Sequence, residues 1–152
     1  MALNIGDQAP AFSSKDTNDK PVALADYHDK QNVFVVFYYA DFSSVCSLQL
    51  AMYNKNLDGF RSRDTAVVAI NRDSSFSHKA FCESLGGIDF PVLSDIDFKM
   101  AKDYGVDLGN GTSDRAEFIV DKSGAIRWIN VEDSPGENTA TMDDIFSAID
   151  AL

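Results

Sequence analysis

The chain contains few cysteines, few prolines and few basic residues. Its 152 residues include two cysteines, four prolines and 13 lysines and arginines, against 24 aspartates and glutamates, so its formal net charge is −11. Nucleic acids and anionic membrane surfaces are disfavoured as partners, because no basic stripe is present to neutralise phosphates. A hydrophobic fraction of 45% excludes a disordered or collagen-like chain. A chain of this length buries about 68–70% of its unfolded surface, so a single domain over residues 1–152 folds without disulfides.

Long apolar runs are also absent. The longest run, residues 33–40, is far shorter than the roughly 20 residues that cross a bilayer. The first residues lack the basic start and the apolar stretch of a secretion signal. We therefore expect a soluble, cytoplasmic protein. In that reducing compartment two cysteines are more often catalytic, redox-active or inert than joined in a permanent bridge.

The hydrophobic pattern predicts alternating strands and helices in one unit, since no repeat or linker divides the chain. The first 30 residues mix turn signals with short alternating pieces, which predicts a hairpin at the edge of the fold. Strands are expected at 33–39, 65–70, 90–93, 116–120 and 125–131. Helices are expected at 43–60, from Ser74 or Ser75 to 85, from Asp95 to 104, and along a C-terminal stripe that ends at Leu152.

The order of these elements is β-α-β, an insertion, and then β-β-α. Parallel strands come early, and an antiparallel hairpin comes late, with its turn at residues 121–124 where a glycine permits positive φ. This order predicts an α/β protein with a thioredoxin-like fold, in which helices flank a central mixed sheet. The fold would carry an N-terminal β extension and a mid-chain insertion.

The first cysteine lies near the start of the helix that follows the first buried strand. If Ser43 is the N-cap, Cys46 is the third helical residue, where free backbone N–H groups and the helix dipole favour a thiolate. A thiol with a pKa of about 8.5 is about 3% ionised at pH 7, whereas one with a pKa of about 6 is about 90% ionised. Position alone leaves two interpretations open: a reactive nucleophile, or a small hydrophobic residue packed with Leu50 and Tyr53.

Residues 33–50 resemble the active-site strand, loop and helix of peroxiredoxins, whose motif is Pro-x-x-x-Thr/Ser-x-x-Cys; here they read VFVVFYYADFSSVCSLQL. The resemblance implies that Cys46 is the peroxidatic cysteine and that Ser43 is the hydroxyl residue of the motif. Gln49 matches the acid or glutamine that the family has one turn further along the helix. We nevertheless expect Gln49 on the solvated face of its helix, outside the site.

Tyr39 stands where the family has proline. The resemblance places Tyr39 and Val45 in the substrate pocket. In the family that proline shields the reactive sulfur, so a phenol at this position predicts a narrower pocket or an altered choice of peroxide.

Three further segments match the family in the same order, and together they extend the resemblance over nearly the whole chain. They are the opening at 6–12, the short strand and cap at 90–95, and the strand and hairpin at 115–124. The last match implies that Arg115 is the active-site arginine. A cation beside a thiolate lowers the thiol pKa and orients the peroxide. The alternative is a surface arginine paired with Asp114 or Glu117.

Cys82 lies 36 residues after Cys46, on a predicted helix. The peroxiredoxin Q or bacterioferritin-comigratory type includes members with a resolving cysteine at a closely similar spacing, so the resemblance implies that Cys82 resolves oxidised Cys46. A disulfide needs Cα atoms within about 7 Å, so at least one of the two helices must unwind locally. A structural thiol is the alternative. A metal site at His78 and Cys82 is disfavoured, because two histidines and two cysteines make no complete ligand set.

The residues and the resemblance together imply a thiol-dependent peroxidase for hydrogen peroxide and organic hydroperoxides, with no metal, haem or flavin. Cys46 attacks the peroxide, Ser43 and Arg115 hold it, and Cys82 forms a disulfide with the oxidised sulfur. A thioredoxin-like dithiol reductant would regenerate the enzyme, which we expect to be a monomer or a homodimer. Two alternatives stay open: a one-cysteine cycle, and a thioredoxin-fold binding or chaperone-like module without turnover.

Overall fold

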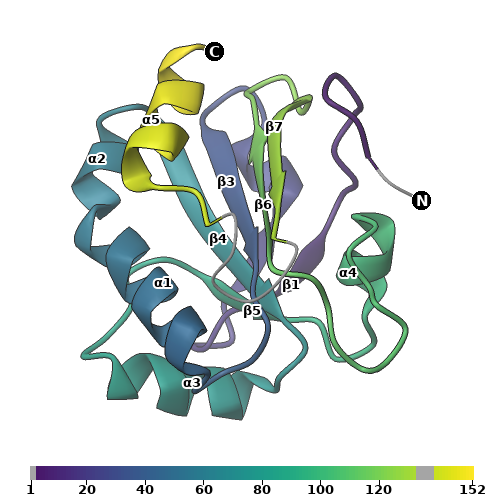
Figure 1. Cartoon of the computed structure of the whole chain (residues 1–152), viewed down its shortest axis with the longest axis vertical. Helices are drawn as coiled ribbons and strands as arrows, with labels where there is room; N and C mark the ends of the chain where they lie inside the picture. The colour runs from purple at the N-terminus through teal and green to yellow at the C-terminus, as the bar shows by residue number, and fades with distance from the viewer. Residues whose placement is uncertain (1–2, 133–138) are drawn as a thin grey trace.

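The computed structural model describes residues 3–132 and 139–152. Its centre is a five-stranded mixed sheet in the order β5-β4-β3-β6-β7 (Figure 1). Three strands run parallel, namely β3 (Asn32–Phe37), β4 (Thr65–Asn71) and β5 (Val92–Ser94). β6 (Ala116–Val120) pairs antiparallel with β3, and β7 (Ile126–Val131) pairs antiparallel with β6. The predicted thioredoxin-like fold is therefore confirmed, with a central mixed sheet and flanking helices.

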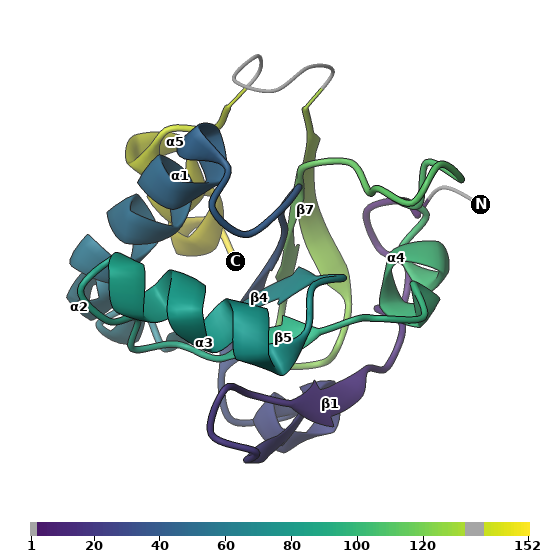
Figure 2. The same cartoon turned by 90° about the horizontal axis from the view of Figure 1, so that it is seen from below.

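Each face of the sheet is covered by its own set of elements (Figures 1 and 2). One hydrophobic cluster joins the sheet to four helices: α1 (Ser44–Lys55), α2 (Leu57–Arg61), α3 (Ser75–Ser84) and α5 (Met142–Asp150). The second cluster joins the other face to α4 (Lys99–Asp103), to the hairpin of β1 (Ser13–Lys15) and β2 (Pro21–Ala23), and to the 3₁₀ helix η1 (Leu24–Tyr27). The hairpin is the predicted N-terminal extension.

The central strand β3 is buried along its whole length. Because side chains alternate across a strand, Phe34 and Val36 enter the first cluster while Val35 and Phe37 enter the second. This explains why the segment contains only large apolar side chains after Asn32. The loop that leads to Cys46 therefore starts from a strand that is held on both faces and along both edges.

Most predicted elements are present close to their expected bounds. β5 lies at the edge of the sheet, as expected for the strand at 90–93. The carboxylate of Asp95 accepts hydrogen bonds from the backbone N–H groups of Met100 and Ala101, both at 2.9 Å, and so caps α4. The hairpin turn before β7 places Gly124 at a φ of 88°.

Two predicted helix boundaries are wrong. The helix expected at 43–60 is divided at Asn56, whose backbone leaves the helical region with φ −102° and ψ 16°. The side chain of Asn56 competes for the helix backbone, because its Nδ2 donates to the carbonyl of Met52 at 2.8 Å. The C-terminal stripe ends with α5, so Leu152 lies beyond the helix and is 40% exposed.

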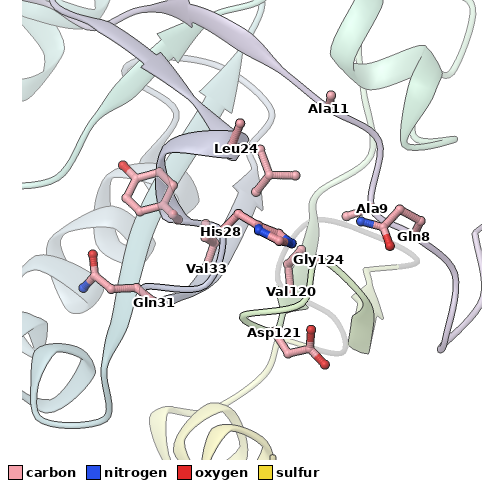
Figure 3. A pocket seen from close by; sticks show the side chains of 12 residues that line it. Gln8, Ala9, Ala11, Leu24, His28, Gln31, Val33, Val120, Asp121 and Gly124 are labelled. Atoms are coloured by element: carbon pink, nitrogen blue, oxygen red, sulfur yellow. The ribbon is translucent and has the colours of Figure 1, made fainter.

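A pocket of about 180 Å³ lies at the end of the sheet opposite to Cys46 (Figure 3). Val33 at the start of β3 and Val120 at the end of β6 line it, together with Leu24 and Tyr27 of η1. Cys46 follows the other end of β3, so this pocket is separate from the cysteine. In the part of the chain that the structure describes, no helix combines the length and the apolar character needed to cross a membrane.

Candidate active site

Cys46 lies in the first turn of α1. The helix begins at Ser44, so Cys46 is the third helical residue, as expected. Ser43 occupies the N-cap with φ −63° and ψ 133°, and its carbonyl accepts the backbone N–H of Ser47 at 2.8 Å. Free N–H groups of this turn and the positive end of the helix dipole therefore lie near the sulfur. The Cys46 thiol is free and fully buried.

Hydrogen bonds fix the loop that leads to Cys46. The side-chain Nδ2 of Asn71, at the end of β4, donates to the carbonyls of Tyr38 and Tyr39 at 2.8 and 2.9 Å. Phe42 has a φ of 64°, a left-handed conformation that turns the chain toward α1. Its ring packs on Phe81 of α3 with a centroid distance of 5.3 Å. The entry of α1 is thus held by β4 and α3.

Arg115 brings a cation to the sulfur. It lies directly before β6, and its Nη1 donates to Cys46 Sγ at 3.3 Å. Its Nε donates to the carboxylate of Glu132, and both side chains are buried. The alternative of a surface arginine paired with Asp114 or Glu117 is therefore wrong. The buried guanidinium places positive charge beside the sulfur, where water cannot screen it.

The expectation that Gln49 faces solvent is wrong. The residue is 4% exposed, and its Oε1 accepts a hydrogen bond from Nη2 of Arg115. On its other side, Nε2 donates to the hydroxyl of Tyr53 at 2.7 Å and to Glu117 Oε1 at 2.9 Å. Gln49 therefore links the arginine at the sulfur to further buried polar groups.

Glu117 is a buried carboxylate held by donors alone. Its Oε1 accepts hydrogen bonds from Gln49 and, at 3.2 Å, from the hydroxyl of Tyr53, while its Oε2 accepts from Asn130 Nδ2 at 3.2 Å. The pKa of Glu117 is raised to about 7. Burial is the main cause of the rise, a hydrogen bond from Asn130 opposes it, and the charge of Glu132 adds to it. Burial and Glu117 likewise hold the pKa of Tyr53 well above its usual value. The carboxyl of Glu117 therefore titrates close to neutral pH.

Two periodicities in the sequence could have identified these groups. Cys46, Gln49 and Tyr53 are separated by three and four residues, so they share one face of α1. Arg115 and Glu117 are two residues apart at the start of β6, so they point to the same face of the sheet. The face of α1 and the face of β6 meet in the first hydrophobic cluster, and no short-range pattern predicts that meeting.

The remaining residues expected at the site lie around the start of α1. Ser43 is half-buried at the N-cap position, but its hydroxyl does not accept a capping hydrogen bond from the helix. Val45 is half-buried in the first turn of α1. Tyr39 is 43% exposed, so its side chain reaches the surface at the mouth of the loop. Its effect on peroxide choice stays a prediction.

Cys82 is 9% exposed on α3 and shares the first hydrophobic cluster with Cys46. Both thiols are free. Burial and the negative charge of Asp41 raise the pKa of Cys82 to about 11, so this thiol is almost fully protonated at neutral pH. Figure 2 shows α1 and α3 as two separate helices on the same side of the sheet.

A buried contact between His78 and Asp41 connects the loop before Cys46 to the helix that contains Cys82. His78 Nδ1 lies 2.8 Å from Asp41 Oδ2, and the hydroxyl of Tyr38 donates to Asp41 Oδ1 at 2.5 Å. His78 Nε2 lies 3.2 Å from the carbonyl of Leu93, so both ring nitrogens have a hydrogen-bond partner. Burial acts to raise the pKa of Asp41, but hydrogen bonds from His78 and Tyr38 hold it below its usual value.

With both ring nitrogens engaged, His78 has none free to bind a metal. The residues that the structure describes contain no group of three or more histidine, cysteine, aspartate or glutamate side chains suited to hold a metal ion.

A thioredoxin-like sheet, a buried cysteine in the first turn of the helix after its central strand, and an arginine against the sulfur define a thiol-based redox protein. Comparison with known proteins identifies the family. The family model described as AhpC/TSA matches residues 5–129. The peroxiredoxin tpx1 of Schizosaccharomyces pombe is 34% identical over 145 residues, which span 89% of this chain and 75% of that protein. The thioredoxin peroxidase of Echinococcus granulosus gives the same identity and the same coverage.

Among solved structures, the reduced 2-Cys peroxiredoxin of Plasmodium vivax superposes with a TM-score of 0.86 at 28% identity, covering 98% of this chain and 96% of that one. The chain belongs to the AhpC/TSA family of peroxiredoxins. It is accordingly a thiol-dependent peroxidase, an oxidoreductase that reduces peroxides with a cysteine.

Proposed function

We propose that Cys46 reduces hydrogen peroxide and organic hydroperoxides in an atypical two-cysteine cycle, with Cys82 as the resolving cysteine, as in the peroxiredoxin Q or bacterioferritin-comigratory type. The proposal rests first on the 3.3 Å contact between Arg115 Nη1 and Cys46 Sγ. This cation lies in contact with the sulfur before the reaction. It also stabilises negative charge on the oxygen that leaves during the reaction.

In the first step, the Cys46 thiolate attacks the terminal oxygen of the peroxide. An S–O bond forms, the O–O bond breaks, and the released alkoxide or hydroxide takes a proton from water, which leaves Cys46 as a sulfenic acid. Ser43 and the N–H groups of the first turn lie at the same end of α1 as the sulfur, where they can hold the peroxide. Because Cys46 is fully buried, side chains of the loop and first turn must move to admit the substrate.

In the second step, Cys82 attacks the oxidised sulfur of Cys46. The S–O bond breaks, the hydroxide leaves as water with the proton of the Cys82 thiol, and a disulfide forms. The two cysteines share one hydrophobic cluster but lie on different helices. Local unwinding of α1 or α3 therefore precedes the bond, and the raised pKa of Cys82 slows the attack.

In the third step, an external dithiol reduces the disulfide by exchange and becomes oxidised itself. A thioredoxin-like protein is the proposed reductant, which agrees with the name of the thioredoxin peroxidase among the relatives. We further propose that residues 1–152 act as one cytoplasmic domain, as a monomer or a homodimer. The raised pKa of Cys82 also supports a one-cysteine cycle, in which a thiol from another molecule reduces the sulfenic acid directly.

Peroxide consumption with a dithiol donor tests the proposal in wild type, Cys46→Ser and Cys82→Ser. Wild type should turn over, Cys46→Ser should not, and Cys82→Ser should stop after one peroxide per chain. Mass spectrometry of oxidised wild type should find an intramolecular bridge between Cys46 and Cys82. Equal rates for wild type and Cys46→Ser would refute the peroxidase role of Cys46. Continued turnover by Cys82→Ser would establish the one-cysteine cycle instead.

A Tyr39→Pro variant tests the proposed substrate pocket at Tyr39 and Val45. If the phenol narrows access to Cys46, the variant should reduce a bulky organic hydroperoxide faster relative to hydrogen peroxide. An unchanged ratio of the two rates would exclude Tyr39 from substrate selection.

A further inference from the structure

The amide of Gln49 has only one orientation that satisfies both of its neighbours. Arg115 can only donate hydrogen bonds, and an ionised Glu117 can only accept them. Gln49 Oε1 must therefore face Arg115, while Nε2 faces Glu117 at 2.9 Å. With the amide reversed, its N–H₂ group would meet the guanidinium, and two donors would face each other. The hydroxyl of Tyr53 cannot decide between the orientations, because it both donates and accepts.

Arg115 fixes Oε1 toward itself, and Glu117 is the charged acceptor that holds the other end of the amide, Nε2. We propose that Glu117 is a positioning residue of the peroxidase reaction, which acts through Gln49 to hold Arg115 against the Cys46 sulfur. The inference rests on the proposed roles of Cys46 and Arg115 in the first step of the reaction. Glu117 is not a catalytic residue, because its contacts run to Gln49, Tyr53 and Asn130.

The surroundings of Glu117 favour this role over a merely structural one. The residue is 1% exposed, and its neighbour on the same face of β6, Ile119, lies in the first hydrophobic cluster. The residue opposite it on β3 is Val36, which is apolar. An apolar side chain would be buried here at lower cost than a carboxylate, because burial of a charge is expensive without a cationic partner in contact. The interaction with Gln49 supplies a reason for the carboxylate.

The charged and titratable groups around Glu117 are Tyr53 on α1, Glu132 after β7, and Arg115 before β6, with Cys46 beyond the arginine. A protonated Glu117 offers one acceptor fewer to its three donors. Since its pKa is raised to about 7, the arrangement that holds Gln49 is complete only above neutral pH. The rate per Cys46 thiolate should therefore fall on the acid side.

A double-mutant cycle in a Cys82→Ser background tests the inference on the first step alone. The variants are Glu117→Leu, Gln49→Glu and their combination, and Glu83→Gln on the exposed part of α3 is the matched control. The readouts are the rate constant for Cys46 oxidation by hydrogen peroxide and the thiolate fraction of Cys46 from its ultraviolet absorbance. Both are measured from about pH 8 to about pH 6.

Glu117→Leu should lower the rate constant at about pH 8 by about tenfold or more, because Gln49 loses the carboxylate that holds its Nε2 and can then move away from Arg115. Adding Gln49→Glu should restore the rate to within about threefold of the control, since a carboxylate binds Arg115 through its charge and needs no acceptor behind it. The rate per thiolate should fall around pH 7 in the control protein and should show no such step in the double variant.

Other outcomes would overturn the inference. A Glu117→Leu rate equal to the control, or a loss that Gln49→Glu does not rescue, would mean that Glu117 does not position Arg115. If Glu117→Leu does not fold, Glu117→Gln decides the matter, because it keeps an acceptor oxygen and should lose only the step around pH 7; a retained step would refute the proposal. A control protein that peroxide does not oxidise would overturn the proposed function itself, and the inference with it.

Discussion

Arg115 divides its guanidinium among Cys46, Gln49 and Glu132, and these contacts determine what can replace it. The planar fork of arginine reaches all three at once, whereas lysine places one ammonium on a flexible stem. Glu132 is also held by Thr139, whose hydroxyl donates to Oε1 at 2.6 Å. The position of the cation beside the sulfur is therefore set by acceptors that lie behind it.

Arg115→Lys should slow Cys46 oxidation by about 10²-fold, because the charge remains but its directed hydrogen bonds are lost. Stopped-flow measurement of peroxide-dependent oxidation gives this rate, and the thiolate absorbance shows how much of the loss is due to thiol ionisation. A rate within a few-fold of wild type would show that charge alone suffices.

Arg115→Met should destabilise the fold by about 3–5 kcal/mol, because it leaves the carboxylate of Glu132 buried without a cation. Urea unfolding measures this loss. The control is Arg127→Met, which removes an exposed arginine that lies 3.2 Å from Asp121 and should cost at most about 1 kcal/mol. Equal losses in the two variants would contradict a buried ion pair at Arg115.

In the proposed two-cysteine cycle, the raised pKa of Cys82 makes disulfide formation dependent on pH. Because burial and Asp41 raise that pKa to about 11, the thiolate fraction grows about tenfold for each pH unit between about 7 and 9. The decay of the Cys46 sulfenic acid into the disulfide should accelerate by up to the same factor, and by less where unwinding of α3 exposes Cys82 and lowers its pKa toward about 8.5, as followed by trapping with a sulfenic-acid reagent. In Cys82→Ser this acceleration should be absent. A decay rate independent of pH would point to a step other than attack by Cys82.

The sequence predicted the two groups in contact, Cys46 and Arg115, but it did not predict the buried polar residues that hold Arg115 in place. Cys46 and Arg115 each stand in a motif that can be read locally, and the helix start at Ser44 follows from Ser43 as N-cap. Gln49, Glu117 and Glu132 were missed because their burial depends on α1 packing against β6 and β7. A polar residue on a helix is usually solvated, and here tertiary packing reverses that tendency.

At the scale of elements, the two cysteines differ in how firmly their supports are held. α1 follows the central strand β3, whereas α3 leads to β5 at the edge of the sheet. Ser74 is the N-cap of α3, and its hydroxyl accepts the N–H of Ser77 at 3.2 Å; Gly86 and Gly87, both with positive φ, follow the end of the helix. The predicted bounds of α3 were nearly correct, because an N-cap serine and a pair of glycines are local signals in the sequence. The break of the first helix at Asn56 was not predicted, because it depends on a hydrogen bond from the Asn56 side chain.

Ser74→Ala should accelerate formation of the disulfide by about fivefold, because loss of an N-cap weakens a helix by about 1 kcal/mol and unwinding of α3 precedes the bond. The matched control is Thr141→Ala, which removes the cap of α5, where Thr141 accepts the N–H of Asp144 at 3.1 Å. The control should lose similar stability without faster disulfide formation. The rate comes from quenched mass spectrometry after oxidation, and equal acceleration in both variants would exclude α3 as the element that opens.

At the scale of the whole molecule, acidic residues dominate the balance of charge. The chain has 24 acidic and 13 basic residues, so repulsion grows as carboxyl groups ionise. The buried carboxyl of Glu117 also lowers the stability of the fold as pH rises, because its pKa is raised from 4.5 to about 7 on folding. A group whose pKa is raised on folding stabilises the fold fully at pH values below its pKa in the unfolded chain. That stabilisation is lost as pH rises through its pKa in the folded protein.

Wild type should therefore lose up to about 3 kcal/mol of unfolding free energy between about pH 4.5 and pH 8 through Glu117 alone. Glu117→Gln should remove this part of the dependence while leaving the surface repulsion unchanged. Urea titrations of both proteins across this range give the difference. Parallel curves for the two proteins would show that Glu117 keeps an ordinary pKa in the fold.

The unequal placement of the two cysteine-bearing helices has a consequence under thermal stress. The loop to Cys46 leaves the most protected strand of the sheet, β3, while Cys82 lies on a helix beside the edge strand β5. As the temperature rises, α3 opens before the strand that leads to Cys46 does. In the proposed cycle this opening brings the Cys82 thiol within reach of the oxidised sulfur. Mild warming should therefore shorten the lifetime of the Cys46 sulfenic acid and protect it from further oxidation.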